Sequence, residues 1–405
     1  MIRAIRLAGK SFGRVAMALS APFRSVMGRM AMAAVTGAAL TACVPAGGPL
    51  EGHGPGRSGT VRVALLVPSG SGNASDQVLA DGLVNAARMA VADLSGVTID
   101  LRIYATAGNP AEAHARALQA ADEGAQIILG PVFAQEANAA GAAVAGRGLN
   151  VLAFSNNPDI AGGNVFILGQ TFDTTARRLA RFAVANGHGR IMVVHERNLA
   201  GEMGKDAILR ATREAGGSVV ATASYEFSQT GVTGAVPGIA RSARESGASA
   251  LFMTADTAGA LPLLTQLLAE SGIDRMMTRF IGLTRWDVPA QTLALPGVQG
   301  GWFALPDPDL YARFRARYEA AYGSAPHPIA SLAYDGIAAI GALARQGRDL
   351  SAASLTQPAG FAGVAGIFRL RADGTCERGL AVAEIRNNQV VVIDPAPRSF
   401  AGAGL

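Results

Sequence analysis

From residue 61 onward, short apolar segments alternate with longer segments in which apolar residues recur every three or four positions. Val61 to Val67, "VRVALLV", is a β-branched apolar segment that ends at the turn sequence "PSGSGN". Apolar residues then recur at helical spacing from Leu79 to Leu94 and stop before Gly96. The next segment, Val97 to Tyr104, alternates with a period of two. The pattern therefore predicts a strand, a helix and a second strand in this order.

The same alternation continues to about residue 285. Asn109-Pro110 begins a predicted helix that ends at Gly124, and further helices are predicted over 134–147 and 174–186. The apolar segments between helices are predicted strands, namely "QIILG", "NVLAFS", "RIMVVHE", "SVVATASYEF", "ASALFMT" and "RFIGLT". Near the end of the chain, "VAGIFRL", "GLAVAEI" and "QVVVI" predict short strands joined by turns.

Strands that alternate with helices are typical of βαβ units, which form mostly parallel sheets covered by helices on both faces. The chain has too many such units for one small sheet. We therefore predict an α/β fold of two doubly wound parallel-sheet lobes. Because ligands bind outside the carboxyl ends of the strands in such sheets, two facing lobes predict a cleft that closes on a ligand.

The first 42 residues have a different composition. They contain six basic residues and no acid, and Met30 to Leu40 is an apolar run too short to span a bilayer. These features predict a secretory signal peptide over residues 1–42, with Met27 as an alternative start. Leu40-Thr41-Ala42-Cys43 resembles the lipobox of bacterial lipoproteins, which implies a lipid on Cys43 that anchors the protein to a membrane. Residues 43–59, rich in Gly and Pro, predict a flexible tether.

Removal of the signal peptide changes the charge of the chain. The whole chain is formally +5, and its first 42 residues carry six positive charges, so about −1 is left for the remainder. A nucleic-acid partner is therefore not expected. With Cys43 acylated, Cys376 has no partner for an intrachain disulfide, and two cysteines are too few for a thiolate metal site. No metal or other cofactor is predicted.

The sequence shows none of the catalytic or nucleotide-binding motifs for which we searched. "HERN" at residues 195–198 has no second histidine at the spacing of a metalloprotease helix, and there is no GxSxG nucleophile elbow. The Gly-rich turn "PSGSGN" lacks the spacing of a dinucleotide or Walker motif. We therefore expect that the protein is not an enzyme.

Four segments, in this order, resemble the type I periplasmic binding proteins of the leucine/isoleucine/valine-receptor kind. They are "VALLVPSGSG", "AHARALQAADEGAQIILGPVF", "FRARYEAAYGSAPHPIASLAYDGIAAI" and "GVAGIFRLRADG". The resemblance covers about residues 61–393 and implies two lobes, joined by three crossover strands, that close on a small ligand. We accordingly expect an N-terminal lobe of residues 60–172 and 303–350, a C-terminal lobe of 173–302 and 351–395, and a tail of 396–405.

Within this family, "EGAQIILGPVF" and "NVLAFSNNPDIAGGNVFILG" look most similar to the penicillin-binding protein activators, which are outer-membrane lipoproteins that stimulate peptidoglycan synthases. That resemblance implies a peptidoglycan synthase as partner. The alternative is the solute receptor of an ABC importer for an amino acid or a related small polar metabolite, with an ABC permease as partner. Val44 is not the Asp that retains lipoproteins at the inner membrane, and this resemblance favours the periplasmic side of the outer membrane.

The candidate ligand-binding residues come from the loops between strands and helices. A buried amino acid needs an acid near its ammonium and polar donors near its carboxylate. By resemblance to the family, Met203 stands in place of an aromatic residue and Asp256 is a substitute acid, whereas Trp286 beside Arg285 is a candidate stacking wall. The full set of candidates is Ser69, Ser71, Gln135, Ser155, Asn156, Asn157, Met203, Asp256, Thr257, Arg285 and Trp286.

Overall fold

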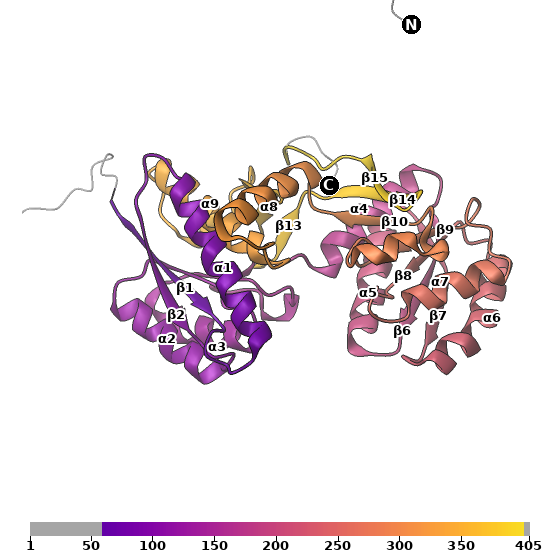
Figure 1. The fold of residues 1–405 in the computed structure, drawn as a ribbon, viewed down its shortest axis with the longest axis horizontal. Coiled ribbons are helices and arrows are strands. Elements are labelled where there is room, and N and C mark those ends of the chain that lie inside the picture. The colour runs from indigo at the N-terminus through magenta and orange to yellow at the C-terminus, as the bar shows by residue number, and fades with distance from the viewer. Residues whose placement is uncertain (1–58, 401–405) are drawn as a thin grey trace, which may run out of the picture. The chain divides into compact units, whose positions relative to one another are not determined.

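The computed structural model of this protein describes residues 59–400 (Figure 1). The predicted signal peptide, Cys43 and nearly all of the predicted tether lie outside these residues. Within the described range, no helix is both long and apolar enough to cross a membrane.

The first lobe is built on a five-stranded parallel sheet of order β2-β1-β3-β4-β5. The strands are β1 (Val61–Val67), β2 (Ile99–Ala105), β3 (Ile127–Leu129), β4 (Val151–Ala153) and β5 (Val165–Ile167). One face is covered by α1 (Ala74–Asp93), α8 (Pro308–Tyr322), α9 (Ala330–Arg345) and α10 (Ala352–Leu355), and the other by α2 (Pro110–Asp122) and α3 (Ala134–Val144) (Figure 1). Leu65 and Leu66 of β1 pack into opposite cores, so this strand is apolar on both faces.

The second lobe is built on a seven-stranded sheet of order β15-β14-β10-β9-β8-β6-β7. Its strands are β6 (Arg190–Glu196), β7 (Ser218–Tyr225), β8 (Ala250–Met253), β9 (Arg279–Gly282), β10 (Trp302–Leu305), β14 (Ala381–Arg386) and β15 (Gln389–Asp394). Strand β14 is antiparallel to both of its neighbours, β10 and β15, and the other neighbouring pairs are parallel. Helices α4 (Phe172–Ala185) and α5 (Leu199–Glu214) cover one face, and α6 (Gln229–Glu245) and α7 (Leu261–Glu270) cover the other. The predicted α/β fold with two parallel-sheet lobes is therefore confirmed.

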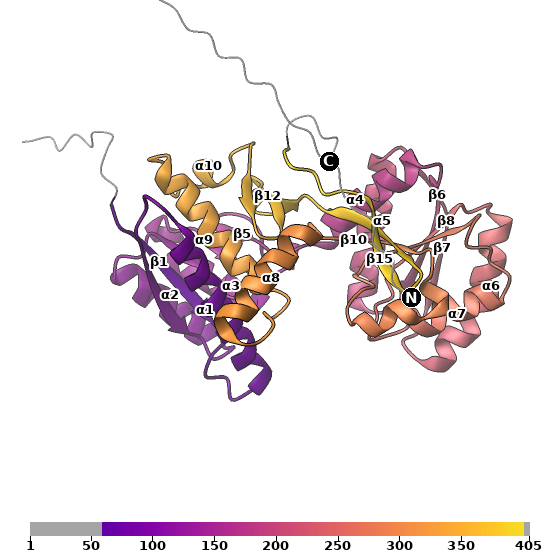
Figure 2. The same cartoon turned by 45° about the horizontal axis from the view of Figure 1, so that its top comes forward.

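A third, antiparallel sheet corrects the expected lobe boundaries. It consists of β11 (Phe361–Gly363), β12 (Gly366–Leu370) and β13 (Cys376–Arg378), which were expected in the C-terminal lobe. Phe361 and Phe368 pack instead into the core of the first lobe, and Figure 2 shows β12 beside α9 and α10. A sheet this small has no core of its own, so its apolar face must be buried against neighbouring helices. Strand β10, expected in the N-terminal lobe from residue 303 on, lies in the second sheet.

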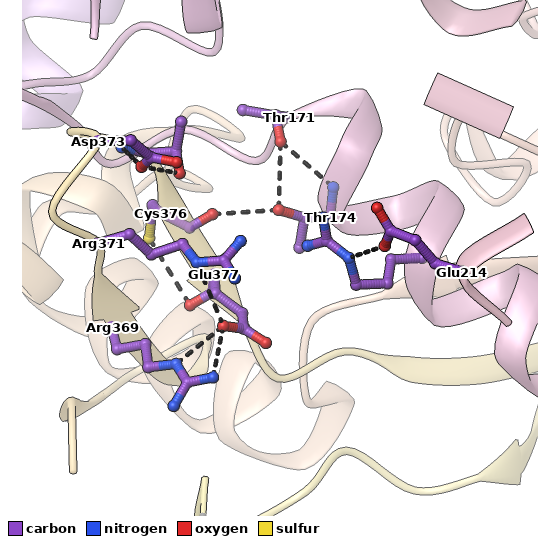
Figure 3. A network of polar contacts seen from close by, with 10 residues as sticks. Thr171, Thr174, Glu214, Arg369, Arg371, Asp373, Cys376 and Glu377 are labelled. Carbon is purple, nitrogen blue, oxygen red and sulfur yellow. Dashed lines mark hydrogen bonds and ion pairs between the residues drawn. The ribbon is translucent and has the colours of Figure 1, made fainter. Parts of the chain in front are cut away.

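The chain passes between the lobes at three places, after β5, after β10 and after β13. Hydrogen bonds connect the first and third of these passages. The Thr174 hydroxyl donates to the Cys376 carbonyl at 3.1 Å, and Arg178 Nε donates to the Leu380 carbonyl at 2.7 Å. Figure 3 shows the Thr174 contact beside the ion pair of Arg369 with Glu377. The expected three crossovers are therefore present, and two of them are tied together by polar contacts.

The boundaries of most elements lie within a few residues of their predicted positions. Helix α4 begins at Phe172 because the Thr171 hydroxyl, rather than Thr174, is its cap. The helix predicted over 134–147 ends as α3 at Val144 and continues as a 3₁₀ turn. Short 3₁₀ turns are η1 (Ala145–Arg147), η2 (Pro158–Ile160), η3 (Ala290–Ala294) and η4 (Pro296–Val298).

Replacement of Phe368 tests whether the third sheet belongs to the core of the first lobe. The Phe368 side chain is fully buried, and the Arg378 guanidinium lies 5.1 Å from its ring centre. We expect Phe368→Ala to lower the free energy of unfolding by about 3–5 kcal/mol, because it leaves a cavity in a shared core. Urea denaturation measures this change. Val392→Ala, at a partly exposed position of β15, is the control and should change stability by less than about 0.5 kcal/mol.

Candidate functional site

A cavity of about 500 Å³ lies at the carboxyl ends of β3, β4 and β5, beside the start of α9. We call this cavity the inter-lobe pocket, because Arg285 of the second lobe contributes to a wall made mostly by the first lobe. Its volume is typical of small-molecule sites, and its position is where open α/β sheets bind ligands. It is lined by Val132, Phe133, Ala134, Phe154, Ser155, Asn156, Gly169, Gln170, Arg285, Pro306, Pro328, Ile329, Ser331, Leu332, Ala365 and Arg378.

Two further cavities share lining residues with the inter-lobe pocket. One, of about 400 Å³, shares Asn156 and is also lined by Met203. The other, of about 480 Å³, shares Arg285 and extends to Tyr311 and Arg315 of α8. The three cavities therefore form a row, with the inter-lobe pocket in the middle.

Arg285 brings a positive charge from the second lobe to the pocket. Its Nε donates to Asp287 Oδ1 at 2.8 Å and its Nη2 donates to Asp287 Oδ2, which leaves Nη1 without a partner among the described residues. Burial by itself would lower the pKa of this guanidinium, but the hydrogen bonds to Asp287 raise the pKa above its usual value. Arg285 is therefore charged, held in place and still able to donate.

Arg378 brings a second guanidinium to the pocket from the end of β13. Its Nε donates to the Leu168 carbonyl at 3.0 Å and its Nη1 donates to Asp335 Oδ2 at 2.8 Å. Nη2 is buried and has no hydrogen-bond partner among the described residues, although the Cys376 thiol, a weak acceptor, lies beside the same guanidinium. The Arg378 side chain is thus more than nine-tenths buried with an unused donor.

Burial also raises the pKa of the Asp335 carboxyl that pairs with Arg378. The Arg378 guanidinium and the Val364 N–H, which donates to Asp335 Oδ1 at 2.8 Å, oppose this rise in pKa. Asp335 is fully buried in α9, so the pair is shielded from solvent.

The remaining wall of the pocket combines apolar side chains with a few hydroxyl and amide groups. Phe133 and Phe154 follow β3 and β4, and Ile329 precedes α9. Ser155 Oγ accepts from the Asn157 N–H at 3.1 Å, which fixes the turn after β4 and places the exposed Asn156 at the pocket. Such a wall suits a ligand with an apolar body and a small polar group.

The structure brings four of the predicted site residues to these cavities. Ser155, Asn156 and Arg285 line the inter-lobe pocket, and Met203 lines the neighbouring cavity that shares Asn156. Asn157 lies next to them, but its side chain caps the turn η2 by accepting from the Asp159 N–H at 2.9 Å. These residues line cavities at strand ends, and their contact with a ligand stays a prediction.

Five other predicted residues line none of the three cavities. Ser69 and Ser71 lie in the loop between β1 and α1, where the Ser71 hydroxyl donates to Asp76 Oδ2 at 2.9 Å. Gln135 is exposed on α3. The Thr257 hydroxyl donates to the Val288 carbonyl at 2.6 Å, and Asp256 is exposed. The pKa of the Glu196 carboxyl is raised mainly by burial and also by the negative charge of the nearby Asp256. These two acids are at the ends of β8 and β6, away from the pocket wall.

Trp286 was predicted as a stacking wall for the ligand, and the structure corrects this prediction. Its side chain is completely buried in the core of the second lobe. A Cβ atom at Gly282 or at Gly301 would lie 2.1 Å from the indole, so these glycines make the space that the ring fills. Arg285 takes the cavity side of the loop and Trp286 takes the core side, because the large apolar ring gains more from burial.

Sequence reasoning missed Arg378, Gln170 and Ser331, all of which line the pocket. Arg378 lies in a segment predicted as a turn, and its partner Asp335 is 43 positions away in sequence. No local pattern indicates such a pairing. Among the described residues, no cluster of three or more His, Cys, Asp or Glu side chains could hold a metal ion.

Comparisons with known proteins agree with this fold. Residues 60–389 match the family model described as periplasmic binding protein. The chain belongs to this family. The comparison with curated protein sequences found no match.

Solved structures with the same fold include several transport proteins. A candidate branched-chain amino acid ABC transporter protein from Rhodospirillum rubrum has a TM-score of 0.71 and 18% identity, over 82% of this chain and 100% of that one. A Desulfitobacterium hafniense ABC transporter substrate-binding protein in complex with Leu has a TM-score of 0.60 and 18% identity, over 83% and 100%. A Rhodopseudomonas palustris solute-binding protein in complex with benzoate has a TM-score of 0.55 and 20% identity, over 84% of this chain and 97% of that one. At these identities the likeness shows the fold.

A buried glutamate in α3 gives a prediction about pH. Glu136, in the first turn of α3, is fully buried and neither carboxylate oxygen makes a hydrogen bond within the described residues. Burial raises the pKa of the Glu136 carboxyl, and the nearby Thr106 side chain opposes the rise without reversing it. Its contribution to stability is therefore complete below the unfolded pKa of about 4.3 and is lost as the pH rises through the folded pKa.

Glu136→Gln removes this pH dependence, because a neutral amide costs less to bury than a carboxylate. We expect the variant to be more stable than the parent protein by roughly 1–2 kcal/mol at pH 7.5 and equally stable near pH 4. Urea denaturation at the two pH values measures the difference. Glu112→Gln, at a position on α2 paired with Arg116 at the surface, is the control and should change little at either pH. A variant that is less stable at pH 7.5 would contradict this prediction.

Proposed function

We propose that this protein is the solute-binding receptor of an ABC importer, and that its two lobes close on a small ligand in the inter-lobe pocket. The observation that carries the proposal is the pocket itself, in which Arg285 of the second lobe faces Ser155 and Asn156 of the first. A ligand that contacts both sets of residues gains more contacts when the lobes approach each other. Binding therefore favours the closed arrangement by its difference in affinity for the two states.

The three crossovers are the natural place for the motion. They are short connections between two separate cores, so a change of backbone angles there moves each lobe without unpacking it. The contacts of Thr174 and Arg178 with the third crossover lie beside this hinge. Closure would leave the two sheets intact and change mainly the shape of the three adjoining cavities.

The comparisons support a transport role. The structures named above are transport proteins, and two of them hold a small molecule that carries a carboxylate, leucine or benzoate. A permease is the partner that such a receptor needs. The family supports a periplasmic location, and the lipobox of Cys43, outside the described residues, supports a lipid anchor to a membrane facing the periplasm. An activator of a peptidoglycan synthase stays a prediction from the sequence.

Thermal denaturation of the purified chain with a panel of L-amino acids, carboxylic acids and muropeptides tests the receptor function. A ligand at 100 times its Kd stabilises the folded state by about 2.7 kcal/mol, so at least one small molecule should raise Tm by several degrees. X-ray scattering should show a smaller radius of gyration with that ligand. Asn156→Ala should reduce the affinity for that ligand at least fivefold, whereas Asn138→Ala, at an exposed position of α3, should not.

A different pattern would reject the importer. If no compound in the panel changes Tm or the radius of gyration, while a peptidoglycan synthase co-purifies with the chain, the protein acts through protein contacts and the activator prediction gains support. Unchanged ligand affinity in Asn156→Ala would remove Asn156 from the site.

A further inference from the structure

We infer that the inter-lobe pocket takes a ligand with a carboxylate and an apolar body but no ammonium group, such as an aryl- or alkyl-substituted carboxylic acid, and discriminates against free amino acids. This inference rests on the proposed function, because it names the ligand class of the same pocket. It follows from the charges that line the pocket, from the donors that are left unused and from the apolar wall.

Both guanidinium groups at the pocket keep donors that no described residue uses. Each uses part of its donors on a carboxylate that is not part of the pocket wall, Asp287 for Arg285 and Asp335 for Arg378. These partners hold the arginines in place and leave Nη1 of Arg285 and Nη2 of Arg378 with N–H groups to donate. Hydrogen bonds between a guanidinium and a carboxylate are among the strongest in proteins, so a ligand carboxylate is the natural acceptor.

The buried donor of Arg378 is the more informative of the two. An unpaired N–H in the interior costs free energy, and native proteins rarely leave one. Arg378 cannot withdraw from this position, because its Nε is bound to the Leu168 carbonyl and its Nη1 to Asp335. A ligand group that accepts from Nη2 would remove the free-energy cost of this unpaired donor. The contact would lie at the end of β13, where the third crossover begins.

None of the residues that line the inter-lobe pocket is Asp or Glu. The ammonium group of an amino acid would therefore lose its water without gaining a carboxylate partner, and it would be close to the positive charges of Arg285 and Arg378. The uncharged groups Ser155, Asn156 and Gln170 cannot compensate a buried positive charge.

Acids do lie close to the inter-lobe pocket. Asp287 lines one adjoining cavity, where it is paired with Arg285, and the other adjoining cavity is lined by Asp159, Asp173 and Asp206. Glu196 and Asp256, at the ends of β6 and β8, line none of the three cavities, and Glu196 already accepts a hydrogen bond from Asn198. Glu196 and Asp256 are therefore not part of the pocket wall, and replacement of Asp256 tests whether it serves an ammonium group.

The rest of the ligand would meet an apolar wall. Phe133, Phe154 and Leu332 supply a wall of ring and alkyl carbon on the side of the first lobe. Burying a ring or a branched alkyl group there contributes roughly 25 cal/mol for each Å² of apolar surface removed from water. A small acid without such a body, such as acetate, would make the charged contacts alone and should bind more weakly.

Calorimetry with two matched series of compounds tests the ligand class on the full chain, stripped of any bound solute by mild denaturation and refolding. The first series is 3-phenylpropanoate, L-phenylalanine and 2-phenylethylamine, and the second is 4-methylpentanoate, L-leucine and 3-methylbutylamine. Within each series the apolar chain, phenylethyl or 3-methylbutyl, is the same, and only the carboxylate and ammonium groups on it differ. We expect at least one of the two acids to bind at least tenfold more tightly than its amino acid, and neither amine to bind.

Matched arginine variants locate the carboxylate. Arg285→Gln should weaken the binding of the acid at least tenfold, and Arg285→Lys should restore part of the loss, since the charge remains but the fork of donors does not. Arg315→Gln, which changes an exposed arginine in the adjoining cavity, should alter affinity less than twofold. Thermal denaturation of each variant shows whether the fold is intact.

The possible outcomes separate the inference from the proposed function. If an amino acid binds tenfold more tightly than its matched acid, and Asp256→Asn weakens that binding, the ligand class is wrong and the receptor function stands. The inference also fails, and the receptor function survives, if a solute of another class binds while both acids do not. If no solute of any class binds, both fail.

Discussion

The ion pair of Arg378 with Asp335 is the interaction that joins the parts of this structure. One guanidinium connects the end of β13, the middle of α9 and the Leu168 carbonyl at the first crossover. Asp335 in turn accepts from the Val364 N–H, so the third sheet is held to α9 by polar contacts as well as by its phenylalanines. Gly363 allows this approach, because a Cβ atom there would lie 2.0 Å from the Asp335 carboxylate. Losing one partner of such a buried pair typically costs about 3–5 kcal/mol, since the other charge is left alone.

The same pair links stability to the site. Because Nε and Nη1 are committed to Leu168 and Asp335, the guanidinium of Arg378, a residue that lines the inter-lobe pocket, is held in a fixed position with Nη2 buried. Arg378 is in the same strand as Cys376, whose carbonyl accepts from Thr174 at the hinge, a contact that Figure 3 shows. Arg285 plays the corresponding part for the second lobe, where Asp287 holds it. Preorganised donors of this kind bind without paying to be ordered first.

Much of the fold could be predicted from the sequence, and the reason is local. Segments such as 61–67 and 190–196 are apolar on both faces, which only a covered parallel strand explains, and the helices between them have one apolar stripe. The rule that ligands bind at strand ends selected Ser155, Asn156 and Arg285, which the structure places on the wall of the inter-lobe pocket. It failed for Trp286, because a loop position does not say whether a side chain faces the cavity or the core. It also missed Arg378, which the sequence pattern placed in a turn rather than in β13.

By itself, the sequence determined an α/β chain of strand–helix units in two lobes, together with the loops in which polar candidates lie. Tertiary structure alone decided that 361–378 packs on the first lobe, that Trp286 fills the space left by Gly282 and Gly301, and that Arg378 meets Asp335. Periodicity reports which face of an element is apolar, since that depends on neighbours within one or two turns. It does not report which core that face joins, or which charges meet across 43 positions, since those depend on how separate elements pack.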